Sequence, residues 1–248
     1  MSRTRYPRTF ELIDLIEDRC DPQAYFRQFE TRVVTEENLR RAWQARECEF
    51  GKLSHEAWNR LKVAAKPHLH KSTANPRAWS QLIDTLNEAR GYIYLRSKGC
   101  SDPVFIPRAK KGGIETPDLE GIRHDQTTIV CEVKTINISD DEVTARRDMK
   151  ARSIEAELPL PFFIKLEKTL EKAFSQLTCY APVKATERVA LIVPNFDDFF
   201  GEYKSTYYAQ IDDFLGSTEK RNCSVAVFNS RTAFHVEIEM QNAEVVNE

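Results

Sequence analysis

The sequence has few glycines and no long apolar run, and each absence argues against a class of protein. Only 8 of the 248 residues are glycine, which argues against glycine-rich linkers and low-complexity tails. No stretch approaches the roughly 18 consecutive apolar residues that suggest a membrane span. The first 18 residues include basic side chains but lack the apolar core of a signal peptide. We therefore expect a soluble cytoplasmic protein that does not associate with membranes.

The sequence also lacks closely spaced cysteines and a strong excess of charge. The nearest two of its six cysteines, Cys20 and Cys48, are 28 residues apart, so no local zinc or iron–sulfur motif is present. The 36 basic and 38 acidic residues leave a formal net charge of -2. A strongly basic total would have indicated nucleic-acid binding. This total is uninformative, although a local basic groove is compatible with it.

Helical patterns dominate the first part of the chain. Apolar residues at helical spacing predict a helix over residues 10–18, and further helix starts are predicted at Asp21, Thr35 and Ser54. Asp21 is followed by proline, which is common in the first helical turn. We expect an N-terminal helical region over residues 1–70 that binds substrate, dimerises or docks a partner protein.

Residues 71–248 show helical and strand patterns in succession. A helix is predicted over residues 75–90, capped by Asn75. It is followed by strands over 92–95, 104–106, 114–122 and 127–138, a helix over 162–180, a strand over 189–193, a helix over 203–215, and strands over 223–228 and 233–238. This order predicts an α/β domain with a mixed central sheet flanked by helices.

The strand predicted over residues 127–138 carries a charged pair. Side chains alternate faces along a strand, so Glu132 and Lys134 point to one side. Cys131 and Val133 point to the other side and are apolar, as a core face should be. One face of this strand is therefore expected to be buried, while the other offers a carboxylate beside an ammonium group.

Asp118 lies on the preceding predicted strand, directly after Pro117. If the two strands form an antiparallel hairpin, Asp118 comes near Glu132, and the proline loosens the sheet at that point. Two neighbouring carboxylates repel each other unless a positive charge lies between them. Mg²⁺ fits this position because it takes one or two carboxylates, several waters and a substrate phosphate. Lys134 would orient the attacking water or stabilise charge on the phosphate.

Pro117-Asp118, thirteen intervening residues and then Glu132-Val133-Lys134 resemble the signature of the PD-(D/E)xK nuclease superfamily. The resemblance covers about 120 of the 248 residues. It implies a restriction-endonuclease-like core, made of a helix, a three-stranded meander, a helix and a further strand. It also implies that Asp118 and Glu132 are metal ligands and that Lys134 is the catalytic lysine.

Two further features belong to the same resemblance. Family members often add a glutamate from the helix before the meander, and Glu88 occupies that helix here, with Asp84 one turn earlier as a competitor. Many also carry a Q-x-x-x-Y motif on the helix after the lysine strand, which Gln176 and Tyr180 match. These two would contact substrate or support Lys134; alternatively they are a helix-surface pair. The four cysteines that bind an iron–sulfur cluster in some relatives of that subgroup have no counterpart here.

Several charged residues near the motif have both a functional and an ordinary interpretation. Arg146, Arg147 and Lys150 follow the lysine strand, where they would contact DNA phosphates or form a solvated helix face. Lys110 and Lys111 are a second basic candidate before the Asp118 strand. Glu120, two residues after Asp118, would be an additional metal ligand or a solvated charge.

Taken with the resemblance, these residues predict a Mg²⁺-dependent nuclease that acts on DNA, with Mn²⁺ as a substitute metal. The site would contain Asp118, Glu132, Lys134 and Glu88. One alternative is a nuclease-fold protein without catalytic activity that serves as a nucleic-acid-binding or assembly module. Another is an unrelated α/β protein in which Glu132 and Lys134 form a surface ion pair.

Overall fold

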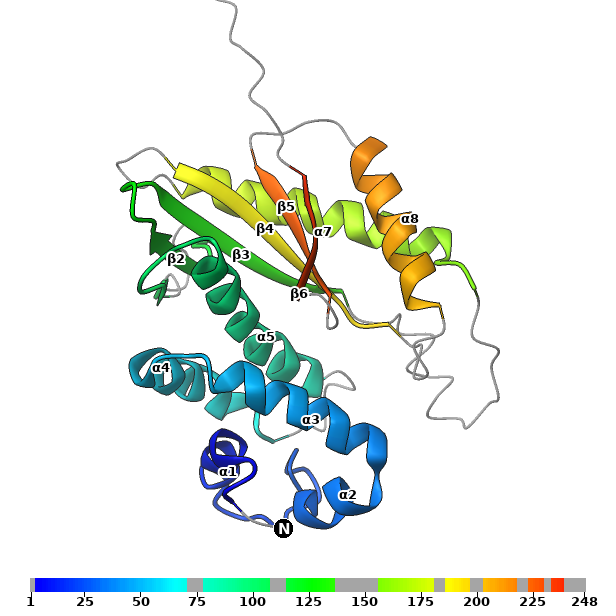
Figure 1. The fold of residues 1–248 in the computed structure, drawn as a ribbon. Coiled ribbons are helices and arrows are strands. Elements are labelled where there is room, and N and C mark those ends of the chain that lie inside the picture. Colours follow the sequence, from blue (N-terminus) through cyan, green and yellow to red (C-terminus); the bar gives the residue numbers. More distant parts are fainter. Residues whose placement is uncertain are drawn as a thin grey trace, which may run out of the picture. The chain divides into compact units, whose positions relative to one another are not determined.

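The computed structural model describes most of the chain, which forms two compact units. The described residues are 3–70, 78–107, 115–136, 156–180, 186–196, 203–217, 223–229 and 233–238. The first unit comprises Met1–Ile93 and the second Tyr94–Glu248. The division lies inside one long helix, α5, to which both units contribute (Figure 1).

The described part of the first unit is helical. Its helices are α1 (Pro7–Ile13), α2 (Phe29–Thr35), α3 (Glu37–Phe50), α4 (His55–Ala65), the 3-10 turn η1 (Lys66–His68) and most of α5 (Ala78–Ser97). The helix starts predicted near Thr35 and at Ser54 are confirmed, and the Ser54 hydroxyl accepts a hydrogen bond of 3.1 Å from the Ala57 amide. Such a cap satisfies an amide at the helix end that has no partner within the helix.

Aromatic side chains form the core of this unit. Trp43 on α3 packs edge-on against Phe26 and Phe29, with ring centroids 5.0 and 5.7 Å away. Trp58 on α4 lies 4.9 Å from the ring of Phe50, and its indole nitrogen donates a 2.8 Å hydrogen bond to Glu11. Buried aromatic pairs of this kind hold the short helices together.

The helix start predicted at Asp21 is wrong, because residues 21–28 form turns. The Asp21 carboxylate accepts a 2.8 Å hydrogen bond from the Gln23 amide two residues on. This contact stabilises a turn in place of a helix, and an aspartate followed by proline fits either structure. The next helix, α2, begins only at Phe29.

The strand predicted over residues 92–95 is also wrong, because α5 continues through this segment to Ser97. Buried apolar residues recur at helical spacing from Leu82 and Leu86 to Tyr92 and Leu95. Burial on this face outweighs the local strand preference of the tyrosines. The chain turns away two residues after the helix at Gly99, whose φ of 86° lies in the left-handed region that favours glycine.

The second unit contains a six-stranded mixed sheet with the order β1-β2-β3-β4-β5-β6. The strands are β1 (Val104–Phe105), β2 (Leu119–Ile122), β3 (Thr128–Ile136), β4 (Thr186–Pro194), β5 (Ser224–Asn229) and β6 (Ala233–Ile238). The first three form an antiparallel meander, β3, β4 and β5 are parallel, and β6 is antiparallel to β5. The predicted α/β class with a mixed sheet is confirmed.

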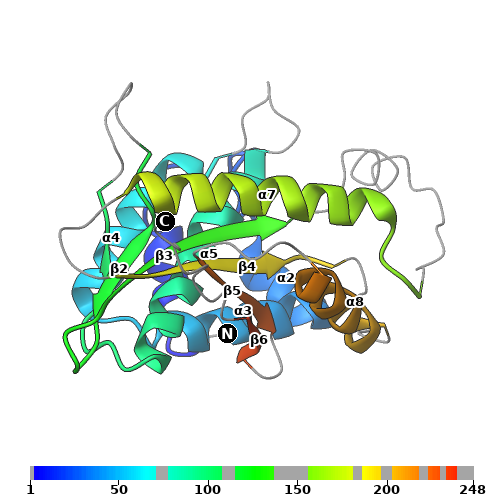
Figure 2. The same cartoon turned by 90° about the horizontal axis from the view of Figure 1, so that it is seen from above.

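Two helices, α7 (Leu160–Cys179) and α8 (Lys204–Ser217), connect the parallel strands and share one core with the sheet. Figure 2 shows α7 running along the sheet over β3 and β4. Leu166, Leu170 and Leu177 of α7 pack with Val130 of β3 and Ile192 of β4. Among the described residues, no helix is both long and apolar enough to cross a bilayer.

Candidate active site

Glu132 and Lys134 lie on the face of β3 that packs against α7. Val130 and Ile136, which share this face because side chains alternate along a strand, belong to the core beneath α7. The opposite face is also buried, at Ile129 for example. The expectation that only one face of this strand is buried is therefore wrong. β3 lies between β2 and β4 and is covered by α7, which places the charged pair inside the fold.

Asp118 is brought beside this pair by the β2–β3 hairpin, as predicted. Leu119, the first residue of β2, pairs with Cys131, so Asp118, directly before β2, lies level with Glu132. The Asp118 Oδ2 atom accepts a 2.8 Å hydrogen bond from the amide of Val133, which follows Glu132 directly. This bond holds the Asp118 carboxylate against β3.

The hairpin owes its register to its turn. Gln126 adopts a left-handed backbone with φ of 67°, and Asp125 accepts a 2.9 Å hydrogen bond from the Thr127 amide. Both features are typical of tight turns. Because a slip of one residue would move every side chain to the other face, this turn determines that Asp118 and Glu132 meet.

Glu132 is a buried carboxylate in which one oxygen accepts a hydrogen bond and the other does not. It is only 2% exposed, and its Oε1 atom accepts a hydrogen bond from Lys134. Its Oε2 atom is buried and accepts no hydrogen bond from a described residue, whereas the protonated side chain of Glu132 donates one to Asp118. Burial, and then the negative charge of Asp118, raise the pKa of Glu132 to about 8, although the Lys134 ammonium opposes the shift. Glu132 is thus costly to ionise unless a positive group approaches Oε2.

Lys134 is positioned by a second contact from α7. Its Nζ atom donates a 2.6 Å hydrogen bond to the side-chain oxygen of Gln176 as well as the bond to Glu132. An ammonium has three donor hydrogens, so one is left for a third acceptor. The Lys134 side chain is 18% exposed, so this third donor can reach a ligand.

Tyr180, one turn after Gln176, contacts the neighbouring strand. Its hydroxyl donates a 3.2 Å hydrogen bond to Glu120 on β2, and burial followed by the Glu120 charge raises the pKa of Tyr180. The two residues of the Q-x-x-x-Y motif therefore connect α7 to β3 and to β2. Glu120 is engaged by Tyr180 and is not simply a solvated charge.

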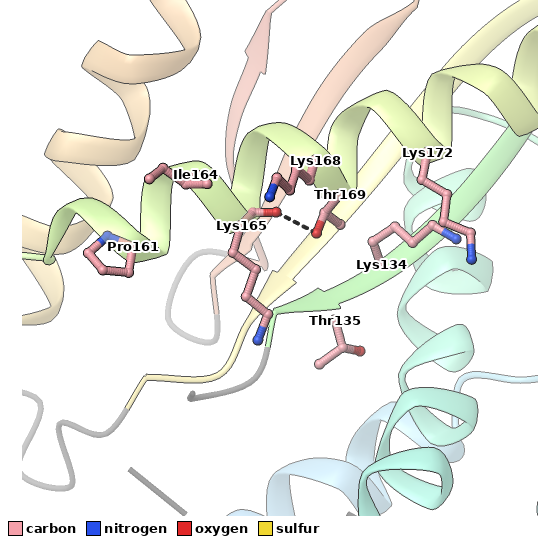
Figure 3. A pocket seen from close by; sticks show the side chains of 8 residues that line it. All are labelled: Lys134, Thr135, Pro161, Ile164, Lys165, Lys168, Thr169 and Lys172. Carbon is pink, nitrogen blue, oxygen red and sulfur yellow. Dashed lines mark hydrogen bonds between the residues drawn. The ribbon is translucent and has the colours of Figure 1, made fainter. Parts of the chain in front are cut away.

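Beside Lys134, the second unit has an open cleft of about 480 Å³. Its lining residues come from the end of β3 and from α7 as far as Lys172: Lys134, Thr135, Pro161, Ile164, Lys165, Lys168, Thr169 and Lys172 (Figure 3). Three of the four lysines were not predicted as site residues. The signal that could have indicated them is their spacing of three and four residues along the helix predicted over residues 162–180, which places them on one face.

Glu88 and the predicted basic residues remain predictions. Glu88 lies on the part of α5 in the first unit and is 9% exposed, so its role as a fourth site residue stays a prediction. The basic residues Arg146, Arg147 and Lys150 lie outside the described residues. The same is true of Lys110 and Lys111.

A divalent cation suits the chemistry of Asp118 and Glu132. The two carboxylates are neighbours, and Glu132 Oε2, which accepts no hydrogen bond from a described residue, is the kind of buried oxygen that a metal ion satisfies. Mg²⁺ needs only one or two protein carboxylates because it keeps several waters. Within the described ranges no group of three or more His, Cys, Asp or Glu side chains is placed to hold a metal ion.

Comparisons of this chain with protein-family models, with curated proteins and with solved structures found no match.

Proposed function

We propose that this chain is a metal-dependent nuclease that hydrolyses phosphodiester bonds in DNA. The observation that carries the proposal is the meeting of Asp118, Glu132 and Lys134 on adjacent strands, with one Glu132 oxygen buried and accepting no hydrogen bond from a described residue. Lys134 lines a cleft together with three further lysines. An ammonium beside two carboxylates and next to such a cleft suits a phosphate ester better than a neutral substrate.

The order of elements supports a restriction-endonuclease-like core as part of this proposal. Helix α5 precedes the antiparallel meander of β1, β2 and β3, and α7 then leads to the parallel strand β4. This is the order that the resemblance to PD-(D/E)xK nucleases implies. Asp118 directly precedes the second strand of the meander, and Glu132 and Lys134 lie on the third.

In the proposed mechanism each residue has a separate task. Asp118 and Glu132 would hold Mg²⁺, or Mn²⁺ as its substitute. When bound, such a metal polarises a phosphoryl oxygen and lowers the pKa of a coordinated water. The Lys134 ammonium would donate to the scissile phosphate and stabilise the charge that develops there. Gln176 would keep Lys134 in place through its 2.6 Å hydrogen bond.

The test is cleavage of supercoiled plasmid and of circular single-stranded DNA in Mg²⁺, Mn²⁺ or EDTA. We expect cleavage with either metal and none in EDTA. Lys134→Ala should reduce the rate by at least about 100-fold, the usual effect of losing a donor to the transition state. Lys204→Ala, which changes a lysine at the start of α8, is the matched control and should cleave as the native chain does.

Other outcomes distinguish the alternatives. Undiminished cleavage by a folded Lys134→Ala variant would exclude the mechanism. DNA binding without cleavage in either metal would favour a nuclease-fold binding or assembly module. Calorimetry that detects binding of neither metal nor DNA would favour an unrelated α/β protein whose Glu132 and Lys134 are a structural ion pair.

A further inference from the structure

A continuous polar stripe runs along α7 toward the proposed site. Lys165, Lys168 and Lys172 lie three and four residues apart, and Gln176 follows at the next turn. Residues at these spacings share one helix face. The three lysines line the cleft, and Gln176 holds Lys134, so the stripe leads from the first half of α7 to the lysine of the site.

The charge in this cleft contrasts with that of the whole chain. The formal net charge is -2, yet among the described residues four lysines and no acidic side chain line this cleft. Figure 3 shows Lys134 and Lys172 extending to the same side of it. A local concentration of positive charge on a chain without a basic excess indicates a specific polyanionic ligand.

The length of the stripe fits a short run of phosphates. At a rise of about 1.5 Å per residue, the backbone from Lys165 to Lys172 spans about 10 Å. A stacked nucleic-acid strand places one phosphate about every 3.4 Å along its axis. Three lysines over this length therefore match about three consecutive phosphates.

The cleft suits one strand better than a duplex. Its volume of about 480 Å³ is in the range of small-ligand sites, which accommodates part of one strand but not a duplex. Pro161 and the 45% exposed Ile164 line the same cleft and give a base or sugar an apolar surface to lie against. Single-strand sites combine a basic groove with such surfaces for the bases.

We infer that this cleft binds one strand of DNA, whose phosphates lie along Lys165, Lys168 and Lys172 and lead to Lys134. The inference rests on the proposed function, because that function identifies the polyanion as DNA. Each lysine would neutralise a phosphate away from the cleaved bond, and the Q-x-x-x-Y end of α7 would lie where the strand enters the site.

The test is fluorescence anisotropy with a labelled 12-nucleotide oligo-dT in EDTA, where no cleavage occurs, from 50 to 200 mM salt. The variant Lys165→Gln/Lys168→Gln/Lys172→Gln should bind about tenfold or more weakly at the lowest salt. The slope of log association constant against log salt concentration should be less negative by about 2. Each phosphate contact on a single strand contributes about 0.7 to this slope, and three contacts are removed. Unchanged affinity and slope would overturn the inference.

A control variant removes the same three positive charges elsewhere. Arg27, Lys52 and Lys66 are exposed in the first unit, and their joint replacement by Gln should leave the slope unchanged. An equal loss in this control would show that total charge, and not the stripe, attracts the DNA, which would overturn the inference. Lysine-dependent binding that is tighter for a 12-base-pair duplex than for oligo-dT would overturn the single-strand assignment.

A parallel cleavage assay separates this inference from the proposed function. If the native chain cleaves DNA in Mg²⁺ while the triple lysine variant binds oligo-dT normally, the stripe alone is refuted. If oligo-dT binding depends on the lysines but no DNA is cleaved in Mg²⁺ or Mn²⁺, the nuclease proposal fails and the strand-binding cleft stands.

Discussion

The side-chain oxygen of Gln176 on α7 accepts a 2.6 Å hydrogen bond from the Nζ atom of Lys134 on β3, although the two residues are 42 positions apart. Lys134 is thereby held between a carboxylate and an amide. A lysine side chain has several rotatable bonds, so a fixed acceptor on a packed helix reduces the number of positions that the ammonium visits. Gln176 acts through Lys134 and is a positioning residue in the proposed mechanism.

Replacing Gln176 by Ala should lower kcat for DNA cleavage by about 10- to 100-fold, as loss of a supporting contact does at metal sites. KM should change much less, because the substrate contacts remain. Thr178→Ala, at an exposed position of the same helix, is the control and should leave both constants unchanged. A Gln176→Ala enzyme with native kcat would remove this residue from the mechanism.

Replacing Glu132 by Gln should stabilise the metal-free protein at high pH. The folded pKa of about 8 lies above the ordinary value of 4.5, so the folded state holds a proton that the unfolded chain has lost. Stability contributed by this proton is complete below about pH 4.5 and is lost as the pH rises through 8. At pH 9 the loss is up to about 5 kcal/mol, which Glu132→Gln should largely avoid.

This pH dependence is measured by urea unfolding in EDTA at pH 4.5, 7 and 9. The difference in the free energy of unfolding between Glu132→Gln and the native chain should grow with pH. In a separate assay with Mg²⁺, Glu132→Gln should not cleave DNA at any of these pH values. Glu167→Gln, at an exposed position of α7, should follow the native curve throughout. If Glu132→Gln is the less stable protein at pH 9, Glu132 is not a carboxylate that is costly to ionise in the folded protein.

Replacing Glu88 by Gln tests the predicted fourth member of the site. If Glu88 binds the metal together with Asp118 and Glu132, its loss should raise the Mg²⁺ concentration for half-maximal cleavage by about tenfold, because the charge of the ligands sets the affinity for the cation. Asp84→Asn, one turn earlier on α5, should change this concentration by less than about twofold. A larger effect from Asp84→Asn would transfer the role to Asp84, and no effect from either would leave a two-carboxylate site.

Replacing Gly121 by Ala should destabilise the strand next to the site. A Cβ atom at Gly121 would lie 2.9 Å from both Cβ and Sγ of Cys100, which is closer than packed atoms approach. We expect a loss of about 1–3 kcal/mol in the free energy of unfolding. Gly216→Ala on α8 meets nothing within 4 Å and should cause no loss. Equal thermal midpoints for the two variants would show that β2 adapts to the added methyl group.

The sequence by itself determined the local pattern of the site. A period of two along residues 128–136 places Glu132 and Lys134 on one side of β3, and the polar turn at Asp125 and Gln126 predicts the hairpin that brings Asp118 to them. The apolar spacing along α7 likewise predicts the helix that carries Gln176 and Tyr180. Each of these features depends on residues close together in the chain, which is why the pattern alone could reveal it.

Tertiary structure alone decided which faces are covered and what meets across them. The β3–α7–β4 crossover places α7 over the charged face of β3, which buries Glu132 and brings the α7 lysines beside Lys134. Tertiary packing also made residues 92–95 helical, against their local strand pattern. Periodicity shows which residues of a segment share a face. Which element packs against that face depends on contacts between segments that are distant in the sequence. Those contacts determine that Glu132 is buried and which residues line the cleft.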